Sequence, residues 1–120
     1  MIQVTASMRV LVAVEPVDFR RGIDGLAQVC RAHLRRDPMS GWVFVFRNRR
    51  ATAVKVLAYD GQGFWLMQKR LSQGRFRWWP SSVTEPGRFL QAHELQVLLS
   101  GGDPDAARGA PIWRPVAAAL

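Results

Sequence analysis

The side chains that most suggest a chemical role in this sequence are cationic, and they are concentrated in its middle third. Between residues 47 and 77 the chain carries eight basic side chains and one acidic side chain, Asp60. This stretch therefore holds +7 of the net charge of +8 carried by all 120 residues. Guanidinium groups bind phosphate oxygens in bidentate geometry, so a cluster of this density predicts a polyanionic partner. The eight cations are Arg47, Arg49, Arg50, Lys55, Lys69, Arg70, Arg75 and Arg77.

A second chemistry to consider is metal-assisted cleavage of nucleic acid, which needs two or three carboxylates around a divalent cation. The chain has nine acidic residues, and they are spread along its length. Asp18, Asp24 and Asp60 are the three that a fold could bring together. Asp18 is better explained as a helix cap and Asp60 as a turn residue, so no metal site is expected.

Few other residues are candidates for catalysis. His33 and His93 each fall at the edge of an expected helix face, where a surface role is the commoner one. Cys30 is the only cysteine, which excludes an intrachain disulfide, and its place in an apolar helical stripe favours a core thiol. The DGQG stretch at 60–63 is not followed by a helix, so it predicts a tight turn instead of a phosphate-binding loop. The sequence indicates no catalytic residue and no cofactor.

A chain of 120 residues with 48% apolar side chains is long enough and apolar enough to form one domain with a single core. The elements of this domain must position the cations. An apolar run at 9–14 predicts a buried strand. Apolar residues at steps of three and four then predict a helix of about 17 to 19 residues that begins at an Asp18 cap and ends before Asp37-Pro38. The expected apolar face comprises Phe19, Ile23, Leu26, Ala27, Cys30 and Leu34.

Four segments rich in aromatic and β-branched residues follow this helix. They span 42–46, 53–60, 64–71 and 75–79, and the short links between them predict hairpins. A second helix is expected over about 88–100, ended by Gly101-Gly102. The predicted fold class is α+β, with an N-terminal strand, a helix, a four-strand antiparallel meander and a C-terminal helix. Residues 1–103 are predicted to form a single domain and residues 104–120 a flexible tail.

The meander has a consequence for the charges. Because consecutive antiparallel turns alternate between the two ends of a sheet, the links at 47–50 and 69–77 fall at the same end. The Asp60 turn falls at the other. Alternation of period two also directs Arg75 and Arg77 to the side opposite Phe76. We therefore expect the basic side chains to line one end of the sheet as a nucleic-acid-binding surface.

The chain lacks the marks of secretion and of membrane insertion. Its N-terminal apolar run is interrupted by Arg9, Glu15 and Pro16, unlike a signal peptide. No run reaches the roughly 18 apolar residues of a membrane span. We expect a cytoplasmic protein that associates with the nucleoid when it binds DNA.

Three segments resemble a known protein family. They are VDFRRGIDGLAQV at 17–29, the stretch 37–79 that contains FVFRNRR and DGQGFWL, and LQAHELQVLLSGGD at 90–103. In this order they are similar to the TnpB accessory proteins, the products of the second open reading frame of the bacterial insertion-sequence family IS66. The resemblance implies a part in transposition beside the element's transposase and its other accessory protein. It supplies no catalytic residues.

Two functions fit these observations. The first is a non-enzymatic accessory protein of DNA transposition that binds nucleic acid, in particular the transposon ends, through the Arg-rich end of its sheet. The alternative is an adaptor that docks the transposase without binding DNA directly. The adaptor surface would be either the Arg-rich surface itself or the polar face of the first helix, which comprises Arg20, Arg21, Asp24 and Arg31.

Overall fold

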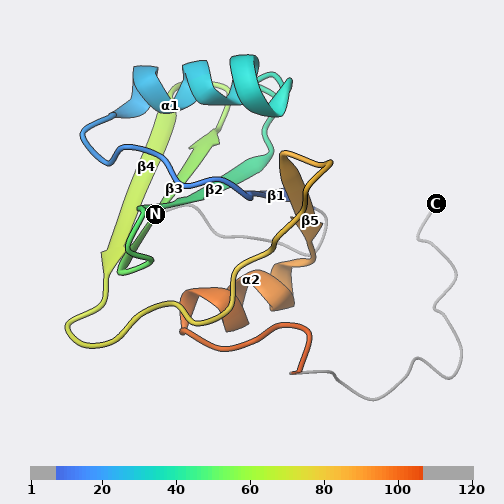
Figure 1. Ribbon diagram of the computed structural model, residues 1–120. Coiled ribbons are helices and arrows are strands. Elements are labelled where there is room, and N and C mark those ends of the chain that lie inside the picture. Colours follow the sequence, from blue (N-terminus) through green and yellow to red (C-terminus); the bar gives the residue numbers. More distant parts are fainter. Residues whose placement is uncertain (1–7, 107–120) are drawn as a thin grey trace, which may run out of the picture.

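The structure is a computed structural model that describes residues 8–106. A five-stranded sheet in the order β4-β3-β2-β1-β5 lies between two helical layers (Figure 1). This confirms the predicted α+β class. The strands are β1 (Val10–Ala13), β2 (Val43–Arg47), β3 (Ala53–Tyr59), β4 (Phe64–Arg70) and β5 (Gly87–Leu90). The helices are α1 (Ile23–Val29), its continuation as a π-helical turn η1 (Cys30–Leu34), and α2 (Ala92–Leu99).

The N-terminal strand β1 lies inside the sheet and not at its edge. It runs parallel to β2, because the helix between them carries the chain back to the end from which β1 started. On its other side β1 pairs antiparallel with β5, while β2, β3 and β4 form an antiparallel meander. Val10 thus has Val43 on one side and Leu90 on the other. Distant parts of the chain meet at β1.

Both faces of the sheet are covered, which explains why β1 and β2 appear in the sequence as unbroken apolar runs. The α1 face has a buried cluster that includes Leu26 of the helix and Phe44 of the sheet. The α2 face has a second cluster that includes Leu95, Leu98 and Val45. The domain is therefore a sandwich of helix, sheet and helix with two apolar layers.

The first helix is shorter than predicted, because the chain from 18 to 22 is not helical. The helix runs from Ile23 to Leu34, and its N-cap is Gly22. The prediction that Asp18 caps the helix is wrong. The Asp18 carboxylate instead accepts the backbone N–H of Arg20 at 2.9 Å. The end of the helix is close to the predicted place, since Arg35 has the left-handed conformation (φ 56°) that terminates it.

Lys55 explains why the residues before Gly22 stay out of the helix. Its ammonium donates to the carbonyl oxygens of Phe19 and Arg21, each at 2.8 Å. It also lies 4.9 Å from the centroid of the Phe19 ring. A longer helix would need these carbonyls for its own hydrogen bonds. Lys55 is only 6% exposed, and these acceptors compensate the burial of its charge.

The prediction of a strand at 75–79 is wrong, and the fifth strand of the sheet is β5. After β4 the chain leaves the sheet edge, and the N–H of Phe76 donates to the carbonyl oxygen of Ala51 at 2.7 Å. Farther on, the indole of Trp79 donates to the carbonyl oxygen of Ala13 at 2.8 Å. Phe76 is buried and the arginines on either side of it are exposed. An irregular segment that packs on the domain through one side alternates between buried and exposed side chains as a strand does. This alternation is the reason that the sequence predicted a strand here.

The second helix starts later than the predicted position 88, because residues 87–90 are used as β5. Gln91 is its N-cap, and the Glu94 carboxylate accepts the Gln91 N–H at 2.9 Å in a capping box. The helix ends at Leu99, just before the two glycines that were expected to stop it.

The chain beyond residue 103 begins against the domain. Pro104 is buried, and the Asp105 carboxylate forms an ion pair with Arg88 at 2.8 Å. Residues 107–120 of the predicted tail lie outside the described residues. No helix within residues 8–106 is long and apolar enough to cross a membrane.

Replacing Phe76 by alanine tests whether this side chain anchors the segment after β4. Phe76 is 3% exposed, so we expect Phe76→Ala to lower the free energy of unfolding by about 3 kcal/mol in urea titrations. The control is Val83→Ala in the same connecting segment, since Val83 is fully exposed and should change stability by less than about 0.5 kcal/mol. Equal losses for the two variants would contradict the described path of the chain.

Candidate nucleic-acid interface

The loop between β2 and β3 is organised by Asn48. Its side-chain oxygen accepts the N–H groups of Thr52 at 2.9 Å and of Ala53 at 3.2 Å. Its side-chain nitrogen donates to the Thr52 hydroxyl at 2.8 Å. Asn favours such turns because its amide replaces backbone hydrogen bonds that the loop cannot make. Arg49 and Arg50 are therefore exposed at the tip of a firmly bonded loop.

The end of β4 and the segment after it lie beside this loop. The sheet register pairs Arg70 with Ala53 at the base of the loop. The hydrogen bond from Phe76 to Ala51 then brings the next segment back to the loop itself. The structure thus places the 47–50 and 69–77 links at the same end of the sheet. The exposed arginines gathered there, hereafter the arginine rim, are Arg49, Arg50, Arg70, Arg75 and Arg77.

Arg47 supports the rim from below and is not part of it. This half-buried side chain donates through Nη1 to the carbonyl oxygens of Asn48 and Arg49, both at 3.3 Å. Its guanidinium lies 5.9 Å from the centroid of the Trp79 ring. The Nε atom is buried and has no hydrogen-bond partner within residues 8–106. Arg47 therefore orients the loop backbone more than it offers charge to a ligand.

The two lysines of the predicted binding set are also engaged elsewhere. Lys55 is buried on the α1 face, where the Phe19 and Arg21 carbonyls hold it, so it cannot reach a phosphate outside the domain. The ammonium of Lys69 donates to the carbonyl oxygen of Leu99 at 2.6 Å. That carbonyl lies at the C-terminus of α2, where the helix dipole favours a cation.

The positive charge of the rim is not neutralised by neighbouring carboxylates. Of the two ion pairs found in residues 8–106, Arg20–Asp18 and Arg88–Asp105, neither includes a rim arginine. Asp60 lies in the turn at the other end of β3 and β4, and its carboxylate accepts the indole N–H of Trp65 at 2.7 Å. This bond is the main cause of the lowered pKa of Asp60. The segregation of charge leaves the rim strongly cationic.

The residues predicted to bind a protein partner lie on the opposite side of the sheet from α2. Arg20 forms an ion pair with Asp18 at 2.6 Å, and hydrogen bonds from Arg20 lower the pKa of Asp18 to about 2. Arg21 packs over Gly25, where a Cβ atom would lie 2.9 Å from the Arg21 Cβ. This close approach explains a glycine inside the helix. All four of the predicted residues, Arg20, Arg21, Asp24 and Arg31, are exposed.

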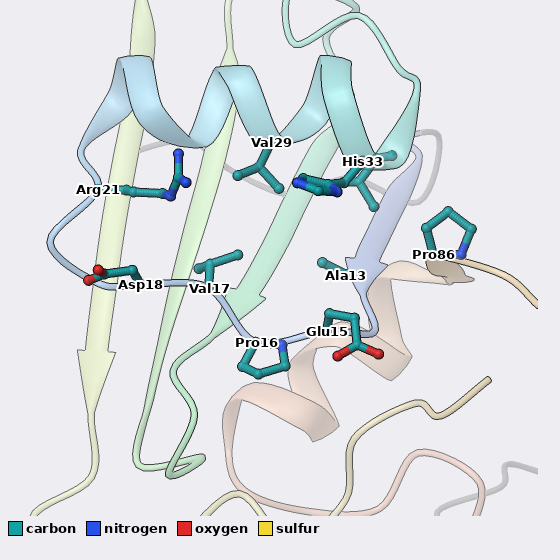
Figure 2. A pocket seen from close by; sticks show the side chains of 10 residues that line it. Ala13, Glu15, Pro16, Val17, Asp18, Arg21, Val29, His33 and Pro86 are labelled. Carbon is teal, nitrogen blue, oxygen red and sulfur yellow. The ribbon is translucent and has the colours of Figure 1, made fainter. Parts of the chain in front are cut away.

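A cavity of about 310 Å³ opens between α1 and the link that joins β1 to it (Figure 2). Its apolar lining includes Ala13, Val17 and Val29. Arg21 and His33 lie on either side of Val29 in Figure 2. The charged and polar side chains around the cavity are Glu15, Asp18, Arg21 and His33. Sequence patterns did not reveal this cavity, because it depends on the irregular path of residues 15–18.

The carboxylates considered for a metal-dependent nuclease do not form a site. No group of three or more His, Cys, Asp or Glu side chains in residues 8–106 is placed to hold a metal ion. Asp18 is bound by Arg20, and Asp60 accepts the hydrogen bonds of its own turn. Asp24 is exposed in the first turn of α1. The geometry gives no support to metal-assisted cleavage.

The sequence matches the family described as IS66 Orf2 like protein over residues 8–109. The chain belongs to this family. This confirms the resemblance to the TnpB accessory proteins and places the IS66 Orf2-like chain among the accessory proteins of transposition. No solved structure matches the chain.

Two relatives of this IS66 Orf2-like chain come from Sinorhizobium fredii (strain NBRC 101917 / NGR234). The uncharacterized protein y4jC is 35% identical over 115 residues, which cover 96% of this chain and 97% of the relative. The uncharacterized protein y4hO is 39% identical over 110 residues, which cover 91% of each. The similarity therefore extends over almost the full length of both relatives.

Removing the Asn48 side chain tests how firmly the rim loop is held. Asn48→Ala removes three hydrogen bonds within the loop, so we expect the free energy of unfolding to fall by about 1–3 kcal/mol. Arg49→Ala, at the exposed tip of the same loop, should change it by less than about 0.5 kcal/mol. Chemical denaturation of both variants is the measurement. An Asn48→Ala protein as stable as Arg49→Ala would show that the loop does not depend on this side chain.

Proposed function

We propose that this IS66 Orf2-like protein is a non-enzymatic accessory factor of transposition that binds DNA through the arginine rim. The observation that carries the proposal is the convergence of five exposed guanidinium groups from three segments at one end of the sheet. Such groups attract the phosphate backbone at long range and bind its oxygens at short range. If the basic side chains served only to keep the protein soluble, they would not need to be concentrated at one end of the sheet.

The form of the rim favours contacts to the DNA backbone over contacts to base edges. Its arginines stand on a hairpin loop, a strand end and an irregular segment, and none of them lies on a helix. Phosphate contacts of this kind fix the position and orientation of DNA without reading its sequence. We infer that the protein holds DNA at the transposon ends, in the cytoplasm at the nucleoid, while the transposase and the other accessory protein of the element act there.

The salt dependence of DNA binding tests the rim. Five phosphate contacts predict a plot of log K against log salt concentration with a slope of about −4.5 for duplex DNA. Replacing both Arg49 and Arg50 by alanine should reduce the steepness of that slope by about two units. Fluorescence anisotropy with a mixed-sequence duplex between about 50 and 200 mM salt gives the slopes.

The matched control for this experiment is the double variant Arg20→Ala/Arg31→Ala. It removes the same number of positive charges from exposed residues that do not belong to the rim. Its slope should stay close to that of the unaltered protein. Equal changes in the two double variants would show that binding follows net charge and not the rim, and an absence of DNA binding at low salt would refute the proposal.

A second candidate function, adaptor for the transposase, is favoured by the cavity beside α1. Its apolar lining can accept an apolar side chain of a partner, and the surrounding Glu15 and Arg21 can bind polar groups next to it. Arg21 belongs both to this cavity and to the surface expected from the sequence to contact the transposase. The cavity and the rim lie at different places, so one protein can use both.

Filling the cavity tests the adaptor function. Val17 is half-buried in the lining, and Val17→Phe would occupy part of the space. We expect this variant to bind the element's transposase about tenfold more weakly in a pull-down or by surface plasmon resonance, with an unchanged salt slope for DNA. The Arg49→Ala/Arg50→Ala protein should retain transposase binding. Undiminished binding by Val17→Phe would exclude the cavity as the docking site.

A further inference from the structure

We propose that β4 pairs antiparallel with β4 of a second copy of this chain, so that two sheets join edge to edge. β4 is the last strand on its side of the sheet and has no partner beyond it within residues 8–106. It has seven residues and no proline, and its one lysine, a residue type that commonly protects an edge, lies near its end with the ammonium bonded to the carbonyl oxygen of Leu99. Trp65, which is 41% exposed, and the half-buried Leu66 and Met67 lie along it.

The other edge of the sheet differs in these respects. β5 has only four residues and begins with Gly87. Its Arg88 is bound to Asp105, and its Phe89 packs against Trp42 with 5.5 Å between ring centroids. The guanidinium of Arg36 lies 5.7 Å from the Phe89 ring. β5 is thus the shorter edge and two of its side chains are held by neighbours, although Phe89 is still 46% exposed, whereas β4 is the longer edge.

The hydrogen bonds between β3 and β4 determine which backbone groups β4 directs outward. Leu71 donates to Thr52, and Asp60 donates to Gly63, at the two ends of this ladder. With the observed register, the bonds to β3 therefore come from the odd-numbered residues of β4. The even-numbered residues direct their N–H and C=O groups to the open side. These residues are Phe64, Leu66, Gln68 and Arg70.

A two-fold axis through Met67 satisfies all of these outward groups. It places Leu66 opposite the partner's Gln68 and Phe64 opposite the partner's Arg70, so even-numbered residues meet even-numbered residues. Roughly eight backbone hydrogen bonds can form in this register. A shift by one residue would bring outward groups against inward ones, and a shift by two would leave strand residues unpaired at both ends.

The same register matches side chains of complementary chemistry. On the α2 face Trp65 lies opposite the partner's Lys69, in a non-hydrogen-bonded pair where side chains are closest. The indole is fixed by its bond to Asp60, and the aliphatic stem of the partner's Lys69 can pack on its ring while the ammonium keeps its bond to the carbonyl oxygen of Leu99. On the α1 face Phe64 lies opposite the partner's Arg70 in a hydrogen-bonded pair, where the aliphatic stem of the arginine can pack on the ring while its guanidinium stays in the rim. The two arginine rims lie at opposite ends of the joint sheet, which keeps their positive charges apart.

Sedimentation equilibrium of the full chain at roughly 1 to 100 µM tests the pairing, and we expect a dimer in this range. Gln68→Pro removes an outward N–H without touching the bonds to β3, and proline is tolerated on such an edge. Because both copies lose this bond, the dimer should dissociate about tenfold or more readily. Gln68→Ala keeps the N–H and should dimerise as the unaltered protein does. A monomer throughout, or equal dimerisation of the proline and alanine variants, would overturn the proposal.

Cysteine cross-linking tests the register and remains decisive if Gln68→Pro does not fold. Met67→Cys places two thiols across the axis with Cα atoms about 4.5 Å apart, within the range that a disulfide spans. Gln68→Cys places them too far apart. The native Cys30 does not interfere, because it is buried and its pKa is raised to about 12. We expect mild oxidation to give a covalent dimer only for Met67→Cys, and the reverse result or no cross-link in either variant would refute this register.

Discussion

The hydrogen bond from the N–H of Phe76 to the carbonyl oxygen of Ala51 joins the two loops that carry the arginine rim. Ala51 directs its carbonyl there from a left-handed conformation (φ 55°), which is unfavourable for a residue with a side chain. Asn48 compensates by satisfying the rest of the loop, and the buried ring of Phe76 holds the other partner in place. The charged surface thus depends on an uncharged contact beneath it.

The cations of this chain divide into two groups according to their surroundings. Arg47 and Lys55 are drawn into the domain, where backbone carbonyls accept their N–H groups. Lys55 fixes the path of residues 19–21, and with it the position of Arg21 beside the cavity at α1. Within residues 8–106 the rim arginines donate to no such acceptors, and they are exposed to solvent. The density of basic residues in the sequence therefore overstates the number of cations that a ligand can contact.

Local patterns in the sequence were sufficient to predict most of the strands and the middle of each helix. The apolar runs at 42–46, 53–60 and 64–71 correspond closely to β2, β3 and β4, and the gathering of loops at one end followed from the order of the hairpins. The start of α1 could not be predicted, because it is set by Lys55, which is 36 residues from Phe19 along the chain. The strand β5 could not be predicted for a similar reason, and residues 88–90 were expected to be helical. Residues 88–90 have a helix-like apolar pattern, but they form a strand because they pair with the edge of β1 that β2 does not cover. That edge exists only once the sheet has assembled.

The interior position of β1 has a consequence for how the protein is made. β1 is synthesised before both of its neighbours in the sheet, β2 and the much later β5. Contacts so far apart in sequence form late and slow the folding of small domains. The nascent chain must therefore keep this very apolar strand without one of its two neighbours until β5 has been synthesised. A truncated chain that lacks β5 would expose the unpaired edge of β1. Such an edge promotes aggregation and makes the chain a substrate for chaperones and proteases.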